Sequence, residues 1–561
     1  MMRHFQQWPY QRAEQKPLIN GMRKARMRLR LAISPAAAIQ AVTEIQALLG
    51  IYQSQSAVAR IRHDQKTDDP FYTAEQAYYD QTDARVAQET QAFYTAMLGS
   101  RHRMELENHY GSLIFRKAEN LREIVQDKIV EDLAEENRLA SDYLQLMSAA
   151  AIPLDGKVYT LAQLEPLLQS PDRQVRQAVH RAEADWLASR AASLDALFDQ
   201  LVSVRNRISS RLGLASFIEV GYKRMERFDY QRSQIEALRQ AVVRYIVPLT
   251  GEIRRLQRRR LNLDALNYYD LPCLFPAGNP QLQIPLASLP DQTSRLLASL
   301  TGQDPSFLRR LSDSGCLDLE ARPNKAPGGY CETIVNAGMP FILMNASGTA
   351  QDVTTLLHES GHAYASLCSL PDLTLLEYRQ PTLETCEIHS TALEFLSYPL
   401  MEPFFGSEAE NYTLMHMTET LLFIPYACMV DEFQHVIYEQ PGLTPEQRHQ
   451  VWQNLECRYQ PDLNYGDDSF YNKGGAWQKK QHIFVSPFYY IDYLLADLVA
   501  LDLWHTSRKD PAKAWKQYDR LCRLGGRDTF LKLLEQAGLA SPFDIGTIKK
   551  VAYAACDFLR L

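Results

Sequence analysis

Residues 353–367 read VTTLLHESGHAYASL, an apolar run interrupted by two histidines and a glutamate. His358 and His362 are four residues apart, so on an α-helix they lie one above the other on the same face. Two imidazoles placed in this way can bind one tetrahedral Zn²⁺ ion. Glu359 lies about 100° around the helix from His358, beside such a metal, where it could act as general base for a polarised water. The stretch therefore predicts a buried metal-binding helix.

The proposed helix has clear limits in the sequence. Ser347 or Thr349 can cap its start, and Pro371 follows its end. Gly361, in mid-helix, costs about 1 kcal/mol relative to alanine. A glycine at this cost indicates that another part of the chain approaches the helix closely there.

A third metal ligand is expected from residues 383–396, LETCEIHSTALEFL, which also read as a helix. Glu384, Glu387 and Glu394 lie near one face of it, beside apolar residues where carboxylates are costly unless they meet cations. Glu387, 29 residues after His358, is the candidate ligand. Glu384 or Glu394 could accept the remaining N–H of a ligand histidine and so fix its tautomer. A solvent-facing acidic stripe is the alternative for these last two.

Length and composition agree with a large globular enzyme. The chain has 561 residues, too many for one compact core, so two or more lobes are expected. The net charge of −7 is mild for this length and argues against nucleic acid as a partner. The start of the chain lacks the apolar core of a signal peptide, and no run approaches 18 apolar residues, so no membrane span is expected. Nine cysteines without CxxC spacing predict reduced thiols and a cytoplasmic location.

Helical periodicity dominates the rest of the chain. A short strand turn is expected at 152–160, around Asp155-Gly156. We divide the chain into an N-terminal helical lobe, 1–200, and a catalytic region, 201–561, whose parts intermix in space. Amphipathic helices are predicted at 36–60, 74–99, 116–148, 173–212 and 231–261.

Strand signal is concentrated just before the HESGH helix. Two β-like runs, Tyr330–Val335 and Phe341–Asn345, are separated by a turn-like segment, and the second leads straight into the helix. This strand could be a sheet edge to which an extended peptide adds by backbone hydrogen bonds. A purely structural hairpin is an equal alternative.

Two separated motifs carry a family resemblance. HESGH is followed by Glu387, Ser390 and Glu394 in the pattern E-x-x-S-x-x-x-E, and residues 481–504 read QHIFVSPFYYIDYLLADLVALDLW. Together they resemble the thimet oligopeptidase and oligoendopeptidase F family of zinc metallopeptidases, and most closely its Pz-peptidase-like members. The likeness extends to YDLPCLFPAGNP and GGYC and covers essentially the whole chain.

The resemblance implies a mainly α fold, a two-lobed helical ellipsoid with a deep substrate channel and a small β-sheet next to the zinc helix. It implies one Zn²⁺ ion and assigns roles to individual residues. Its zinc ligands would be His358, His362 and Glu387, its general base Glu359, and its contacts to the substrate carbonyl His482, Tyr490 and Tyr493.

One departure from the family pattern affects the last of these assignments. In the thimet branch the histidine precedes a Gly-rich loop, whereas here IFVSP, residues 483–487, fills that place. A flexible hinge is therefore doubtful, and Tyr489 is the next candidate for the carbonyl contact.

The predicted function is a zinc-dependent oligoendopeptidase that hydrolyses internal bonds of short unstructured peptides. Zinc would polarise a water, Glu359 would take its proton and pass it to the leaving amine, and nearby donors would stabilise the oxyanion. Two alternatives stay open: a zinc carboxypeptidase or dipeptidase of related helical fold, and a non-catalytic zinc-containing peptide-binding protein. Oligomeric state and cleavage preference do not follow from the sequence.

Overall fold

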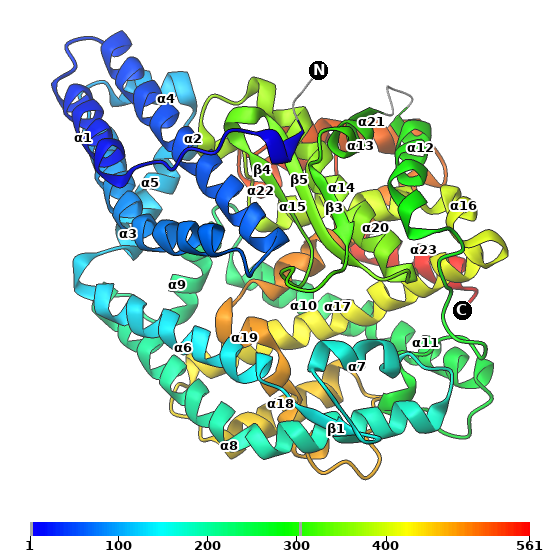
Figure 1. The fold of residues 1–561 in the computed structure, drawn as a ribbon. Coiled ribbons are helices and arrows are strands. Elements are labelled where there is room, and N and C mark those ends of the chain that lie inside the picture. The colour runs from blue at the N-terminus through cyan, green and yellow to red at the C-terminus, as the bar shows by residue number, and fades with distance from the viewer. Residues whose placement is uncertain (1–3, 302–305) are drawn as a thin grey trace. The chain divides into compact units, whose positions relative to one another are not determined.

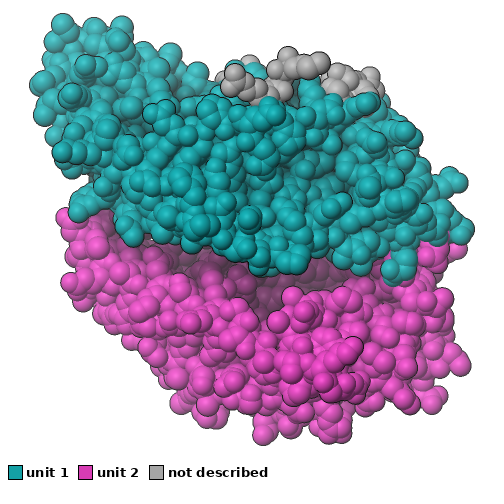
Figure 2. Space-filling view, in the orientation of Figure 1, with its two compact units in different colours: residues 1–123, 281–407, 499–540 teal, residues 124–280, 408–498, 541–561 magenta. Residues whose placement is uncertain are grey.

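A computed structural model describes residues 4–301 and 306–561, and it is built mostly of α-helices (Figure 1). The chain forms two compact units, each assembled from three separate segments (Figure 2). Unit 1 comprises residues 1–123, 281–407 and 499–540, and unit 2 comprises 124–280, 408–498 and 541–561. The predicted division at residue 200 stays a prediction.

Unit 1 contains the HESGH motif and a three-stranded sheet. The boundary between the units falls within α20 (Tyr490–Ser507), after Leu498. The helices of unit 1 are α1 (Gln15–Leu31), α2 (Pro35–Gln65), α3 (Pro70–Leu98), α4 (Arg103–Tyr110), α5 (Leu113–Ile124), α12 (Leu289–Thr301), α13 (Ser306–Asp313), α14 (Ala350–Ser369), α15 (Leu383–Leu396), α16 (Glu402–Phe405), α21 (Pro511–Leu524) and α22 (Phe530–Ala537).

The sheet of unit 1 lies against α14. Its strands are β3 (Leu317–Glu320), β4 (Tyr330–Ile334) and β5 (Met339–Ala346), in the order β3-β5-β4. Strand β5 runs parallel to β3 and antiparallel to β4, and all its residues except Asn345 are buried. The prediction that this strand could be a sheet edge is wrong, because β3, which the sequence analysis did not identify, covers its second side.

Unit 2 is helical apart from one small hairpin. Strands β1 (Ile152–Leu154) and β2 (Lys157–Tyr159) pair around Asp155 and Gly156, which both have positive φ, as the predicted turn requires. The helices of unit 2 are α6 (Val130–Ser148), α7 (Leu161–Leu168), α8 (Arg173–Leu212), α9 (Phe217–Arg224), α10 (Arg232–Tyr245), α11 (Val247–Arg260), α17 (Ala409–Glu439), α18 (Pro445–Tyr459), α19 (Gln481–Val485) and α23 (Ile545–Leu559).

Two predicted helices are broken in the structure. The helix expected at 231–261 is divided into α10 and α11, because Pro248 lacks an N–H and its ring clashes with the preceding helical turn. The helix expected at 116–148 ends at Ile124 and resumes at Val130, after a single 3₁₀ turn that buries Ile129. Periodicity did not reveal this second break, since both halves have the same helical period.

The mainly α class and the small β-sheet of the predicted fold are confirmed, and the substrate channel stays a prediction. The chain is mainly α, with a small β-sheet beside the HESGH helix. Among the described residues, no helix is both long enough and apolar enough to cross a membrane.

Candidate active site

Helices α14 and α15 bring the three predicted metal ligands together within unit 1. One ligand atom from each of His358, His362 and Glu387 lies within 4.8 Å of the other two. The two imidazole rings are 5.0 Å apart between centroids, and His358 Nε2 lies 3.4 Å from Glu387 Oε2. Four-residue spacing on one helix and a partner carboxylate on the next thus give a compact three-donor cluster.

The start of α14 is fixed by a capping box. Thr349 is the N-cap, and the side chain of Asp352 reaches back towards it. Asp352 Oδ2 accepts hydrogen bonds from the backbone N–H groups of Ser347, Gly348 and Thr349, at 3.0, 2.6 and 2.8 Å. Of the two predicted caps, Thr349 is the one used.

Gly361 explains how α15 comes close enough to supply Glu387. A Cβ at this position would lie 2.3 Å from the backbone oxygen of His389 and 2.6 Å from Cα of Ser390, both on α15. Real Cβ atoms do not approach backbone so closely, so only glycine permits this packing. The close approach that the sequence predicted at Gly361 is confirmed, and the approaching element is the backbone of α15.

Glu394 orients the first predicted ligand. Its Oε1 lies 2.7 Å from Nδ1 of His358, which leaves Nε2 facing Glu387. Burial opposes protonation of His358, but hydrogen bonds to Glu387 and Glu394 raise its pKa well above the ordinary value. Of the two glutamates considered for this role, Glu394 contacts the histidine; Glu384 is buried on the same helix.

Glu359, the predicted general base, is a buried carboxylate on α14. Its carboxylate accepts a hydrogen bond from the backbone N–H of Cys331 on β4. Burial raises the pKa of Glu359 to about 7, with Glu387 and Glu394 adding to the rise and His358 opposing it. A carboxylate with a pKa near 7 can both accept and return a proton at neutral pH.

The three donors suit a divalent cation. Two imidazole nitrogens and one carboxylate oxygen are a ligand set that zinc uses in catalytic sites, with a further position left for water or substrate. Burial lowers the pKa of His362 to about 4, so this ring is neutral and able to bind a metal. A cation between His358 Nε2 and Glu387 Oε2, which lie 3.4 Å apart, would supply the positive charge that this carboxylate otherwise finds only in a protonated His358.

The remaining predicted residues form an aromatic cluster in unit 2. The ring of His482 lies 4.9 Å from that of Tyr490 and 5.9 Å from that of Tyr493. Tyr489 also belongs to it, at 5.8 Å from His482 and 4.9 Å from Tyr493. The structure thus assembles all four side chains in one cluster.

The segment that replaces the family's Gly-rich loop is firmly anchored within unit 2. Ile483 and Phe484 of this segment are fully buried, and the buried guanidinium of Arg205 donates to both of their carbonyl groups. The residue that follows the segment, Phe488, is also fully buried, and its N–H donates to Gln434 Oε1 at 2.8 Å. The buried guanidinium of Arg227 donates to the carbonyl of Phe488 and to Asp492. These contacts support the expectation that the segment does not act as a hinge.

Three residues beside the aromatic cluster around His482 were not predicted from the sequence. Phe423 and Tyr426 of α17 pack against Tyr490, with ring centroids at 5.4 and 5.9 Å. Lys480 donates a hydrogen bond to the Tyr490 hydroxyl at 3.1 Å. Of the three, only Lys480 could have been suspected from the sequence, because it stands two residues before His482.

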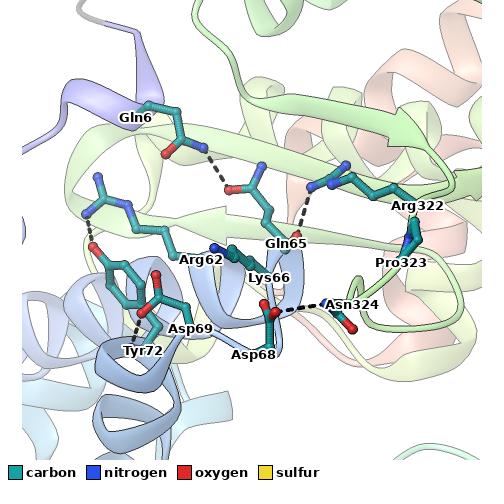
Figure 3. A pocket seen from close by; sticks show the side chains of 10 residues that line it. All are labelled: Gln6, Arg62, Gln65, Lys66, Asp68, Asp69, Tyr72, Arg322, Pro323 and Asn324. Carbon is teal, nitrogen blue, oxygen red and sulfur yellow. Dashed lines mark hydrogen bonds between the residues drawn. The ribbon is translucent and has the colours of Figure 1, made fainter.

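A separate pocket of about 420 Å³ in unit 1 contains none of the predicted site residues (Figure 3). Its walls carry opposite charges, among them Arg62 and Asp69. Arg62 donates to the Tyr72 hydroxyl and to the carbonyls of Phe5 and Trp8, so it ties the N-terminal segment to α2.

Helical architecture and an HExxH helix with a downstream glutamate are the features of a metallopeptidase of the helical type. Two family models match the chain: the peptidase family M3 model at residues 306–552 and the peptidase M3 N-terminal domain model at 5–125. The chain belongs to peptidase family M3, which confirms the predicted family.

Two solved structures are similar in fold to this protein over essentially its whole chain. Pz peptidase A, solved with an inhibitor, is 36% identical with a TM-score of 0.93, and the match covers 99% of both chains. A candidate oligoendopeptidase F, solved at 3.1 Å, is 38% identical with a TM-score of 0.93, and covers 100% of this chain and 99% of that one.

A sequence relative is more distant. Oligopeptidase PepF of Bacillus subtilis (strain 168) is 23% identical over 399 residues, which is 67% of this chain. The match spans 58% of that relative, little more than half of its length.

Proposed function

We propose that this protein is a zinc-dependent oligoendopeptidase that cuts internal bonds of short unstructured peptides. The observation that carries the proposal is the donor cluster of His358, His362 and Glu387, with the buried carboxylate of Glu359 on the same helix. Membership of peptidase family M3, and similarity to Pz peptidase A along the whole chain, support the choice of peptides as substrates.

The chemistry follows from the placement of these side chains. A bound zinc ion would polarise a water molecule and the carbonyl of the bond to be cut. Glu359 takes a proton from the attacking water and returns it to the leaving amine. Glu394 holds His358 in the tautomer that presents Nε2 to the metal.

His482, Tyr490 and Tyr493 are proposed to donate hydrogen bonds to the substrate carbonyl as negative charge develops on it. Their clustering within unit 2 and the family resemblance of residues 481–504 support this role. Burial raises the pKa of Tyr490, so its hydroxyl keeps its proton and is a donor at neutral pH.

The proposal is tested with a peptide blocked at both ends. Protein freed of metal by chelation should not cut it, and stoichiometric zinc should restore cleavage at an internal bond. Glu387→Ala should lose zinc on dialysis, as measured by metal analysis. Release of terminal residues only, from unblocked peptides, would favour the carboxypeptidase or dipeptidase alternative; binding without cleavage would favour the non-catalytic one.

We also propose a cytoplasmic location. All nine cysteines are free thiols in the structure, as a reducing compartment would leave them. Fractionation of the source cells should recover peptidase activity with cytoplasmic markers, and recovery outside the cell would contradict the proposal.

A further inference from the structure

Lys480 is a cation enclosed by aromatic rings beside the proposed substrate-contacting residues. It directly precedes α19, and its Nζ lies 4.9 Å from the ring centre of Tyr490 and 5.0 Å from that of Tyr426. The same nitrogen donates to the Tyr490 hydroxyl at 3.1 Å. The ammonium is therefore held next to the hydroxyl that the proposed function assigns to the substrate carbonyl.

This ammonium has hydrogen-bonding capacity to spare. A lysine ammonium has three donors, and within the described ranges Lys480 has one acceptor, the Tyr490 hydroxyl, and no carboxylate within 4.0 Å. The adjacent Lys479 differs, because its ammonium is paired with Glu183 at 3.2 Å and lies 3.3 Å from the Tyr471 hydroxyl. Two neighbouring lysines thus have opposite environments, one neutralised by the protein and one not.

The charge balance around Lys480 favours an incoming anion. Burial and, to a smaller extent, the charge of Lys479 lower the pKa of the Lys480 ammonium to about 8, while Glu165 opposes the shift. The side chain is partly accessible, so a ligand can reach it. A carboxylate placed against the ammonium would form a charge-assisted hydrogen bond and offset the cost of burying the cation.

We propose that Lys480 binds a carboxylate of the peptide substrate, either the C-terminal carboxylate or an acidic side chain, an inference that rests on the proposed peptidase function. Tyr426 and Tyr490 hold the lysine chain in place through its contact with their rings. Lys480 would therefore determine which peptides are preferred, while the chemistry of bond cleavage is left to other residues.

Binding is measured first, by fluorescence anisotropy of a fluorescein-labelled octapeptide with the zinc-loaded protein. Every protein in this assay, including the one with wild-type Lys480, carries Glu359→Gln, so that the peptide is not cut during the measurement. The peptide is made in two forms, with a free C-terminal carboxylate and as the C-terminal amide. In a second series, the amide form carries a single Glu at one position, each position being taken in turn, and is compared with the peptide that carries Gln at the same position. Wild type should bind one carboxylate form about tenfold more tightly than its neutral counterpart. The member of the series that shows the preference identifies the source of the carboxylate.

In Lys480→Met, the affinities for the preferred carboxylate peptide and for its neutral counterpart should differ by no more than about twofold, and the affinity for the neutral peptide should be unchanged. Lys480→Arg, which keeps the charge, should retain most of the preference. Lys473→Met, at an exposed lysine of the same unit, is the matched control and should behave as wild type. The ratio of the carboxylate peptide to its neutral counterpart is then measured again as a ratio of kcat/KM for cleavage, with Glu359 intact.

Two results would overturn the inference: wild type without preference for any carboxylate peptide, or Lys480→Met with the preference intact. A variant that only lowers the unfolding temperature and keeps the preference would show that the lysine is structural. Failure of the proposed function looks different, since zinc-loaded wild type would then cut none of the peptides, while the anisotropy ratios would still decide the role of Lys480.

Discussion

The donor cluster on α14 and α15 and the aromatic cluster around His482 differ in how their polar groups are satisfied. In the first, the protein supplies partners: Glu394 contacts His358, and the N–H of Cys331 contacts Glu359. In the second, rings pack edge-on, and the cation of Lys480 has a phenol beside it. The first arrangement suits a fixed ion, which requires preset geometry, and the second suits substrates that differ from one another.

The strongest test of the donor cluster is Glu359→Gln. Removing the proton acceptor should lower kcat about 10³-fold and leave zinc bound, because the amide keeps the size of the side chain but cannot take a proton. Initial rates of peptide cleavage give kcat, and metal analysis of the same sample gives the zinc occupancy. Near-normal turnover in a fully zinc-loaded variant would remove Glu359 from the mechanism.

The corresponding test of the aromatic cluster is Tyr493→Phe. Loss of one donor to the developing oxyanion should lower kcat about 10²-fold with little change in KM, because the contact matters most in the transition state. Tyr489→Phe is the matched control, four residues away in the same cluster. A larger loss for Tyr489→Phe would reassign the contact to that residue, and an effect on KM alone would assign Tyr493 to substrate binding.

Glu394→Gln tests whether Glu394 acts on zinc affinity rather than on turnover. The weaker acceptor should hold His358 less firmly, so zinc affinity should fall about 10- to 100-fold in competition with a chelator, while turnover at saturating zinc falls less. Glu384→Gln, on the same helix, is the control and should change zinc affinity less. Equal effects of the two substitutions would contradict the specific pairing of Glu394 with His358.

Gly361→Ala tests the packing beneath the donor cluster, and its expected effect is on stability rather than on the chemistry. The added methyl should push α15 from α14 and destabilise the protein by about 1–3 kcal/mol, measured by thermal unfolding without metal. Gly442→Ala is the control, since a Cβ there meets nothing within 4 Å. An unchanged unfolding temperature for Gly361→Ala would mean that the two helices separate at no cost.

The sequence predicted best what depends on neighbours in the chain. The motif helix was bounded correctly by Thr349 and Pro371, and α8 was predicted residue for residue, between the cap Asp172 and the left-handed Gly213. Capping and helix termination are local events, so their signals lie within a few residues of the ends they mark.

Features that depend on distant segments were missed or only half predicted. Gly361 indicated a close approach but not that α15 makes it, and β5 was considered as an edge because its pairing with β3 leaves no mark in its own sequence. The environment of Lys480 depends on Tyr426, 54 residues earlier, and so could not be read from the motif around His482.

The turn between β5 and α14 has a consequence for how this region can change. Because Asp352 Oδ2 binds three successive N–H groups, the central strand and the motif helix are joined by a connection of fixed length. One inserted residue would rotate the following helix by about 100° and turn both histidines away from Glu387. Selection on this segment should therefore tolerate substitutions that preserve the turn but reject insertions and deletions.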